Sequence, residues 1–250
     1  MAMKQNSLVI ELSHWNAVTD WHAIARSGVL GVIHKFSQGT NYRDPMFEAA
    51  RAGCKSAGLM FGRYHFAEGS DVKSQVQNFL ANLEDDELLA LDWETNTNSS
   101  GTMTLSQAVA FVQDVEAHVG HYPVLYSGNV AKEALKAGPN PTLARCHLWL
   151  AHYANQPVCP PGWSEPWLWQ WTDKGTCPGI VGAVDQDAYQ NSPDDLRSEW
   201  TGDRKPAVPA RPEQPAQPDA SCDTITITVP AGSRVLIHTT GDPGNVIASG

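Results

Sequence analysis

The chain of 250 residues is 42% hydrophobic and 18% charged, with a formal net charge of −10. A chain of this length can hold one barrel-sized domain with an appendage. Its acidic balance, with no basic stripe, argues against a protein that binds nucleic acid, and no apolar run reaches the length of a membrane span.

Two features of the composition bear on the compartment. The first seven residues lack the apolar segment of a signal peptide, which predicts synthesis in the cytoplasm without a signal. The five cysteines form neither a CxxC pair nor the spacing of metal ligands. We therefore expect free thiols, no metal ion and no cofactor. A disulfide between Cys159 and Cys177 after export is the alternative, because these residues flank one predicted loop.

Strand-like and helix-like segments alternate along the first 200 residues. The predicted strands are residues 8–12, 30–36, 59–66, 88–92, 122–126, 147–151, 166–171 and 181–185. The predicted helices are residues 19–28 with Thr19 as N-cap, 44–58 with Asp44 as N-cap and Pro45 in the first turn, 70–84, and 104–120 with a capping box at Thr104.

This order predicts an α/β fold with a mainly parallel sheet. About eight strands in roughly 200 residues fit an irregular, TIM-like (β/α) barrel better than an open sheet. Helical patterns thin out after about residue 138, so the second half of the barrel is expected to contain few helices. In such a barrel the chemistry sits at the carboxyl ends of the strands.

The composition changes after the predicted barrel, which we place at residues 1–202. Between residues 203 and 222 five prolines recur at every third position, as in an extended polyproline linker. Residues 223–250 contain two short alternating segments and read as a small β-hairpin-like tail. A lone hairpin is marginal in water, so the tail is expected to dock on the barrel, to mediate self-association or to stay loosely ordered.

The predicted strand at residues 88–92 ends in two carboxylates, Asp92 and Glu94, separated by Trp93. Alternate side chains on a strand share a face, so both carboxylates should point the same way, about 6.7 Å apart along the strand. Two like charges at the end of a buried strand have pKa values that are pushed apart. Such pairs cleave glycosidic bonds.

Other predicted strands also end in polar side chains. These are Glu11, Lys35, Tyr64, Tyr126 and Asp185. Each one alone is ordinary at the wet end of a barrel, but their coincidence at equivalent positions favours one shared site.

The chain resembles the glycoside hydrolase family 25 lysozymes, the Chalaropsis-type N-acetylmuramidases, over about residues 8–200. Six segments match the family in order: Ser13-His14-Trp15-Asn16, Lys35-Phe36-Ser37-Gln38-Gly39-Thr40 with Tyr42-Arg43-Asp44-Pro45, Gly62-Arg63-Tyr64-His65-Phe66, Leu91-Asp92-Trp93-Glu94, Trp169-Gln170-Trp171-Thr172 and Val184-Asp185-Gln186-Asp187. The resemblance implies hydrolysis of the β-1,4 bond between N-acetylmuramic acid and N-acetylglucosamine in bacterial peptidoglycan.

By position, the resemblance makes Glu94 the general acid and Asp92 the residue that orients the reacting sugar. Asp185 then closes the acidic cluster from the far side of the barrel, and Glu11 is a fourth acidic residue of the site. The predicted substrate contacts are Tyr64, Tyr126, Trp171 as a sugar platform, Lys35 and Trp15. Glu11 departs from the family, which usually has aspartate there, and we expect activity to survive the longer side chain.

Several alternatives stay open. A retaining, an inverting or a substrate-assisted mechanism fits the estimated carboxylate spacing, and we favour the last. A chitinase-like barrel of family 18 is a rival, although Ala90 stands where its signature has an aspartate. A non-catalytic sugar-binding barrel is the rival from another class. The missing signal peptide suggests a phage or prophage endolysin that acts on the cell wall after release.

Overall fold

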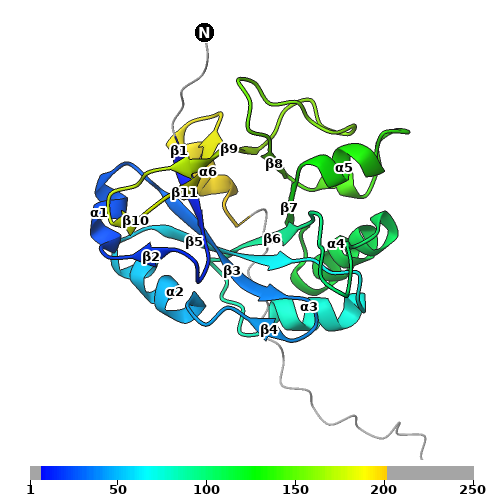
Figure 1. Cartoon of the computed structure of the whole chain (residues 1–250), viewed down its shortest axis with the longest axis horizontal. Helices are drawn as coiled ribbons and strands as arrows, with labels where there is room; N and C mark the ends of the chain where they lie inside the picture. Colours follow the sequence, from blue (N-terminus) through cyan, green and yellow to red (C-terminus); the bar gives the residue numbers. More distant parts are fainter. Residues whose placement is uncertain (1–6, 202–250) are drawn as a thin grey trace, which may run out of the picture. The chain divides into compact units, whose positions relative to one another are not determined.

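The computed structural model describes residues 7–201 (Figure 1). The predicted linker at 203–222 and the predicted tail at 223–250 lie outside the described residues. Eight strands form a closed ring in which each strand pairs with two neighbours. In spatial order they are β1 (Ser7–Leu12), β11 (Val184–Tyr189), β9 (Leu168–Gly175), β8 (Leu148–Ala151), β7 (Val124–Ser127), β6 (Leu88–Asp92), β5 (Met60–Phe66) and β3 (Gly31–Gln38).

The ring is parallel except at one strand. β1 and β3 pair in parallel, and so does every neighbouring pair from β3 round to β9. β11 runs antiparallel to both β9 and β1. The predicted α/β barrel is therefore confirmed, with the closing strand reversed.

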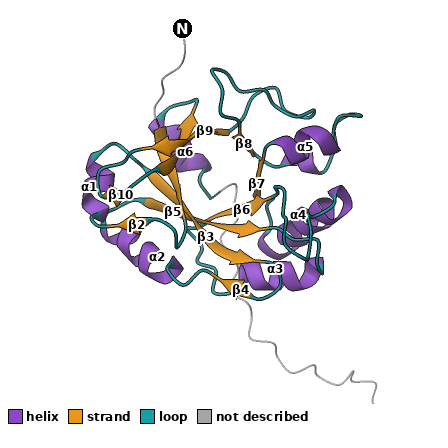
Figure 2. Ribbon diagram, viewed as in Figure 1, coloured by secondary structure: helices purple, strands orange, loops and turns teal. Residues whose placement is uncertain are grey.

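The helices of the described residues are α1 (Trp21–Arg26), α2 (Phe47–Ser56), α3 (Val72–Leu80), α4 (Leu105–Val119), α5 (Asn129–Ala134), the 3-10 turn η1 (Leu143–Arg145) and α6 (Pro193–Glu199). Helices α1 to α5 lie outside the ring of strands, whereas α6 packs against the core inside the ring (Figure 2). Between α5 and α6 the described chain contains only η1, which confirms that the second half has few helices. Three two-residue strands complete the fold: β2 (Ala17–Val18), β4 (Tyr42–Arg43) and β10 (Ile180–Val181).

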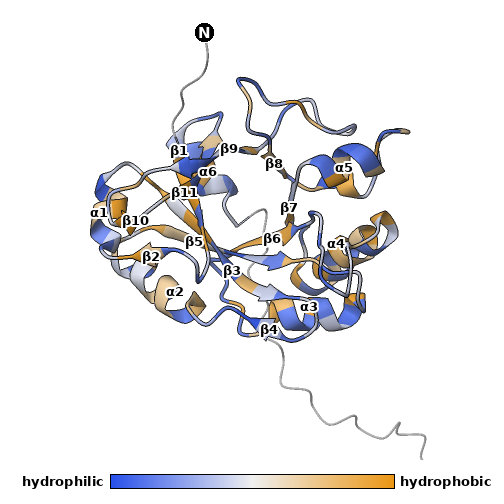
Figure 3. Ribbon diagram, in the orientation of Figure 1, coloured by the Kyte–Doolittle hydropathy of each residue, from blue (hydrophilic) through white to orange (hydrophobic). Residues whose placement is uncertain are grey.

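Strand β6 shows how the barrel divides its core. All five of its residues are buried. Leu88 and Ala90 pack inside the barrel with Trp149, whereas Leu89 and Leu91 pack in the outer layer that also contains residues of α4. β6 is mostly hydrophobic in Figure 3, as expected for a strand that is buried on both faces. The same alternation places Asp92, the last residue of β6, on the inner face with Leu88 and Ala90.

The predicted helix starts are partly wrong. α1 begins after Asp20, whose side chain accepts a hydrogen bond from the Ala23 backbone, so Thr19 is not the cap. α2 begins at Phe47, after Met46 as N-cap, so Asp44 is not the cap. One oxygen of the Asp44 carboxylate accepts hydrogen bonds from the backbone and ring of His14, and the other accepts from the Met46 backbone. α3 is capped by Asp71 and ends at Leu80.

The α4 prediction is confirmed. Thr104 and Gln107 form the capping box at its start. Gly120 ends the helix with φ 83°, a left-handed conformation that glycine adopts without steric cost.

The last predicted strand is wrong in its extent. Residues 180–181 form β10, which pairs with β2, and the barrel strand runs from Val184 to Tyr189. Cys159 and Cys177 carry free thiols, so the disulfide alternative does not hold in this structure.

The amino end of the barrel is closed by Trp200, which follows α6. Its indole nitrogen donates to the Phe61 carbonyl oxygen at 2.9 Å, and the side chain is buried. The ring lies so close to β3 that a Cβ at residue 31 would come within 2.5 Å of it. Gly31 is therefore required for this close approach.

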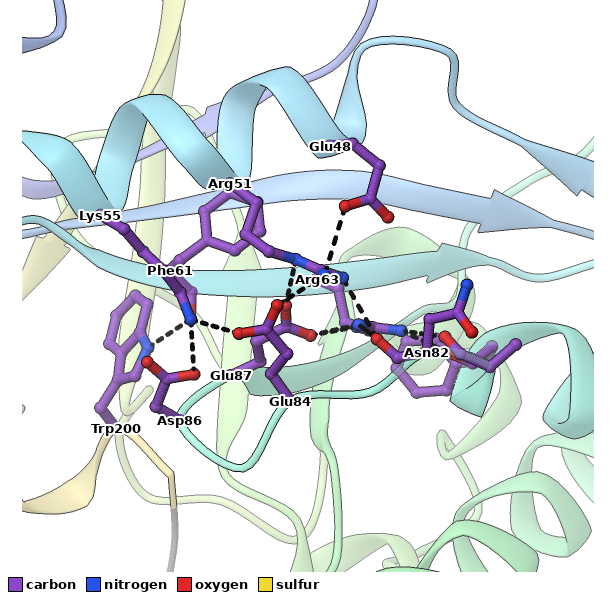
Figure 4. Close-up of polar contacts among 12 residues, drawn as sticks. Glu48, Arg51, Lys55, Phe61, Arg63, Asn82, Glu84, Asp86, Glu87 and Trp200 are labelled. Atoms are coloured by element: carbon purple, nitrogen blue, oxygen red, sulfur yellow. Dashed lines mark hydrogen bonds and ion pairs between the residues drawn. The ribbon is translucent and has the colours of Figure 1, made fainter.

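A buried guanidinium joins β5 to the end of α3 (Figure 4). Arg63 is fully buried, forms an ion pair with the equally buried Glu87 and donates hydrogen bonds to the carbonyl oxygens of Phe79, Ala81 and Asn82. Arg51 supplies a second cation to Glu87, with 2.7 Å between nitrogen and oxygen. The N–H groups of Arg63 therefore supply hydrogen-bond donors to the carbonyl oxygens left unpaired at the carboxyl end of α3, where a positive charge is also favourable.

Candidate active site

Four carboxylates converge at the carboxyl end of the parallel strands. Glu11 on β1 lies directly opposite Asp185 on the antiparallel β11. β6 is four strands away from β11 in either direction around the ring. Asp92 and Glu94 therefore face Glu11 and Asp185 across the barrel mouth.

Trp93 separates the two carboxylates by pointing the other way. It is buried in the outer layer, and its indole nitrogen donates to the Met103 carbonyl oxygen at 2.8 Å. Asp92 and Glu94 consequently lie on the inner side of the strand, close enough for the Glu94 charge to raise the pKa of Asp92. The period-two reading of this segment agrees with the structure.

Burial raises the pKa of every carboxyl in the cluster, and a neighbouring negative charge adds to each rise. Burial is the largest cause at Glu11, followed by the charges of Asp185, Asp187 and Glu94. Burial also raises the pKa of Asp92 well above its usual value, and that of Asp185 to about 6. At least part of the cluster is therefore protonated in mildly acidic solution.

One cation faces these acids. Burial lowers the pKa of Lys35, and the negative charges of Asp92, Asp44 and Glu11 oppose this shift. Its ammonium group donates to Gln38 at 2.7 Å and lies 4.8 Å from the centre of the Phe66 ring. Lys35 lowers the pKa of both Asp92 and Glu94 and so favours their ionised forms.

Gln170 is a buried hub that the sequence interpretation did not single out. Its amide nitrogen donates to Glu11 at 2.6 Å, and its amide oxygen accepts from the hydroxyls of Tyr126 at 2.9 Å and Tyr153 at 2.7 Å. The side chain is fully buried. A lone amide in the apolar strand Leu168-Trp169-Gln170-Trp171 was the available signal, since a buried polar group needs partners.

The predicted substrate tyrosines lie in the cluster. Tyr64 is buried and hydrogen-bonded to Glu11. Tyr126 is buried against Trp149, with 4.6 Å between ring centres. Trp15 lies in the turn after β1, where it is 84% exposed and contacts the His14 ring. These three residues stay candidate substrate contacts.

Trp171 is placed away from the mouth, which corrects its assignment as a sugar platform. Since Gln170 points into the barrel, its neighbour on β9 points out. The Trp171 indole nitrogen donates to the Ser7 hydroxyl at 3.0 Å, at the opposite end of β1 from Glu11. It packs against the outer cluster of Leu148, Leu150 and Trp169.

A pocket of about 360 Å³ opens beside Glu94. It is lined by the ends of β6, β7 and β8 and includes Tyr126, His152 and Tyr153. A cavity of about 410 Å³ lies at the amino ends of β8 and β9, where Glu199 accepts hydrogen bonds from Trp167 and Tyr189. The converging carboxylates place the chemistry at the smaller pocket.

Residues 7–201 contain no group of three or more side chains suited to hold a metal ion. None of the helices in this part of the chain is long and apolar enough to cross a membrane.

We expect the cluster to make the free energy of unfolding depend on pH. A carboxyl whose folded pKa is raised stabilises the fold below its unfolded pKa, and this contribution is lost as the pH rises through the folded value. For Asp185 the window runs from about 4 to about 6. Asp185→Asn should therefore raise stability at pH 8 more than at pH 5, measured by urea unfolding.

The matched control is Asp114→Asn on the outer helix α4, where the side chain contacts His118. Comparing each variant with the native chain at both pH values cancels the titration of groups outside the acidic cluster, including buried His65, whose pKa is lowered to about 4. Equal stability changes at the two pH values for Asp185→Asn would contradict the assignment.

A closed barrel whose strand ends hold facing carboxylates with raised pKa values is the architecture of a glycoside hydrolase.

Comparisons assign the family. The model of "Glycosyl hydrolases family 25" matches residues 10–180, and the chain belongs to this family. The chain is 26% identical to lysozyme M1 of Streptomyces globisporus, over 73% of this chain and 67% of that protein.

Solved structures agree. The bacterial lysozyme of Streptomyces coelicolor superposes with a TM-score of 0.70 at 25% identity, over 77% of this chain and 95% of that one. A muramidase from Trichobolus zukalii gives a TM-score of 0.66 at 28% identity, over 77% and 97%. The protein is thus a family 25 glycoside hydrolase with the lysozyme barrel.

Proposed function

We propose that the protein is a lysozyme that hydrolyses the β-1,4 bond between N-acetylmuramic acid and N-acetylglucosamine in bacterial peptidoglycan. The observation that carries this proposal is the pair Asp92 and Glu94, faced by Glu11 and Asp185 across the mouth of the barrel. The names of lysozyme M1 and of the Trichobolus zukalii muramidase support the substrate class.

Glu94 is the proposed general acid. It lines the pocket, and burial raises its pKa, which keeps a proton available for the leaving oxygen. Asp185 adds to this rise through its negative charge, whereas Lys35 opposes it. The pKa of the proposed acid, Glu94, therefore depends on Asp185, a carboxylate from the opposite side of the barrel.

Asp92 is the proposed partner of the substrate. Its Oδ1 atom is buried and has no hydrogen-bond partner among the described residues. An N–H group of the sugar's 2-acetamido substituent would satisfy this oxygen. Burial and the charge of Glu94 raise the pKa of Asp92. A hydrogen-bond donor from the substrate would stabilise the ionised form of Asp92. Of the two carboxyl groups, Glu94 would then be the one that holds a proton.

This arrangement favours a substrate-assisted mechanism. The acetamido oxygen attacks the anomeric carbon as the glycosidic bond breaks, and Glu94 gives its proton to the leaving oxygen. Glu94 then takes a proton from water, which attacks the same carbon and regenerates the acetamido group. The first product should keep the β configuration, which proton NMR of fresh digests can measure. An α product would instead indicate inversion by a direct attack of water.

The function is tested by digesting purified peptidoglycan and identifying the new reducing ends by mass spectrometry. We expect reducing-end N-acetylmuramic acid. Reducing-end N-acetylglucosamine would mean a glucosaminidase, and cleavage of chitin oligomers alone would favour the chitinase-like rival. Binding without any cleavage by the native chain would favour the non-catalytic barrel.

The cell wall is the proposed place of action. Release as a phage or prophage endolysin is a finer part of the same proposal. We also propose that the catalytic barrel lies within residues 1–202. Deleting residues 203–250 and measuring both wall lysis and oligomer size tests the tail's role in wall binding or self-association.

A further inference from the structure

Tyr153 is an exposed aromatic residue whose far end is held in place. It follows β8 in the loop at the mouth and is 53% exposed. Its hydroxyl nevertheless donates to the buried Gln170 amide at 2.7 Å. An untethered tyrosine at this exposure would sample several rotamers, so the hydrogen bond restricts the ring to one orientation.

The fixed ring lies at the reacting group. Tyr153 and Glu94 both line the same pocket of about 360 Å³, together with Thr95, Tyr126 and the backbone of Gly128. A ligand that fills this pocket contacts an aromatic ring and a carboxyl group at once. Binding sites of this composition take ligands with an apolar face and polar edges.

We propose that Tyr153 is the aromatic platform for the sugar ring that binds beside Glu94, and that Gln170 is the positioning residue that holds this platform. The inference rests on the proposed function, because it takes the ligand to be an N-acetylated sugar of the peptidoglycan chain. It gives the site the stacking surface that Trp171 does not provide.

The orientation of the Gln170 amide supports its role. The amide nitrogen is directed at Glu11, a group that accepts hydrogen bonds, so the oxygen is left to face Tyr126 and Tyr153. Glu11 thereby determines which end of the amide the tyrosines meet. The residue that departs from the family's usual aspartate is therefore coupled to the platform through one buried side chain.

The experiment measures binding of a tetrasaccharide of alternating N-acetylglucosamine and N-acetylmuramic acid to the Glu94→Gln protein. Tyr153→Ala should weaken binding about tenfold, the order expected for loss of one aromatic contact. It should also remove the upfield NMR shifts that a stacked ring causes in the sugar protons. Tyr153→Phe keeps the ring, so these shifts should persist with a smaller loss of affinity.

Gln170→Met tests the tether. It should weaken binding when Tyr153 is present and have much less effect in the Tyr153→Phe background, where the tether is already lost. Tyr122→Phe is the matched control, because this tyrosine precedes β7 at the other end of the strand and its hydroxyl contacts Arg145. Unchanged affinity and unchanged proton shifts in Tyr153→Ala would overturn the inference.

The lysozyme proposal and the Tyr153 platform proposal predict different experimental failures. If the native chain cleaves peptidoglycan and Tyr153→Ala binds normally, only the platform is wrong. If the tetrasaccharide binds in a Tyr153-dependent way but the native chain cleaves nothing, the platform stands and the lysozyme proposal fails.

Discussion

Glu94→Gln is expected to lower kcat for peptidoglycan cleavage by about 10²–10⁴-fold while the protein still folds and binds glycan. Glutamine has almost the same shape as glutamate, but its amide has no proton to give to the leaving oxygen. The substitution also removes one charge from the cluster that raises the pKa of Glu11 and Asp92. The folded state should therefore become more stable at neutral pH, and thermal unfolding checks this.

The matched control is Glu133→Gln on α5. That carboxylate is exposed and pairs with Lys136 on the outside of the barrel, so cleavage should be unchanged. Rates are measured from the release of reducing sugar. A Glu94→Gln protein that keeps more than a tenth of the native kcat would contradict the assignment of Glu94 as the general acid.

The second large effect concerns stability. Arg63→Met should lower the free energy of unfolding by about 3–5 kcal/mol, because it deprives the buried Glu87 carboxylate of its fully buried ion-pair partner. Arg51 would still pair with Glu87, but the carbonyl oxygens of Phe79, Ala81 and Asn82 at the end of α3 would lose the hydrogen bonds from Arg63. Urea unfolding followed by tryptophan fluorescence measures the change.

Lys55→Met is the control from the same cluster. Lys55 pairs with Glu84 and Asp86 but is 39% exposed, so its removal should cost less than about 1 kcal/mol. Equal losses for the two substitutions would show that burial of the Arg63 charge does not dominate the energetics of this cluster.

The positions of Asp92 and Glu94 were predictable because they depend on one strand. Alternation of side chains is a local rule, and the buried run before Asp92 made the strand evident. The same rule could have excluded Trp171. A buried amide at Gln170 requires the next side chain on β9 to point outward, and the structure places it there.

The reversed direction of β11 was less evident. Parallel strands need a crossover of a dozen or more residues, and the stretch between β9 and β11 is shorter than that. The short connection between β9 and β11 indicates an antiparallel pair. The apolar residues at 180–181, however, resembled the start of the barrel strand. They pair instead with β2, a partner far away in the sequence.

The hub at Gln170 could not be predicted from local pattern. Its partners come from β1, β7 and the loop after β8, and only the closed ring brings them together. The predicted cap at Asp44 failed for a similar reason. His14 lies 30 residues away in sequence and donates hydrogen bonds from its backbone and ring to one oxygen of the Asp44 carboxylate. The other oxygen accepts from the Met46 backbone.

Closure of the ring by β1 and β11 has a consequence for folding on the ribosome. The first strand of the barrel lacks one neighbour until residues 184–189 have been synthesised, so most of the chain must emerge before the ring can close. Pairing across such a long sequence separation is slow. A nascent chain already carries Asp92 and Glu94, but Glu11 meets Asp185 only at this last step. Catalytic competence is therefore acquired late and all at once, when the final strand docks.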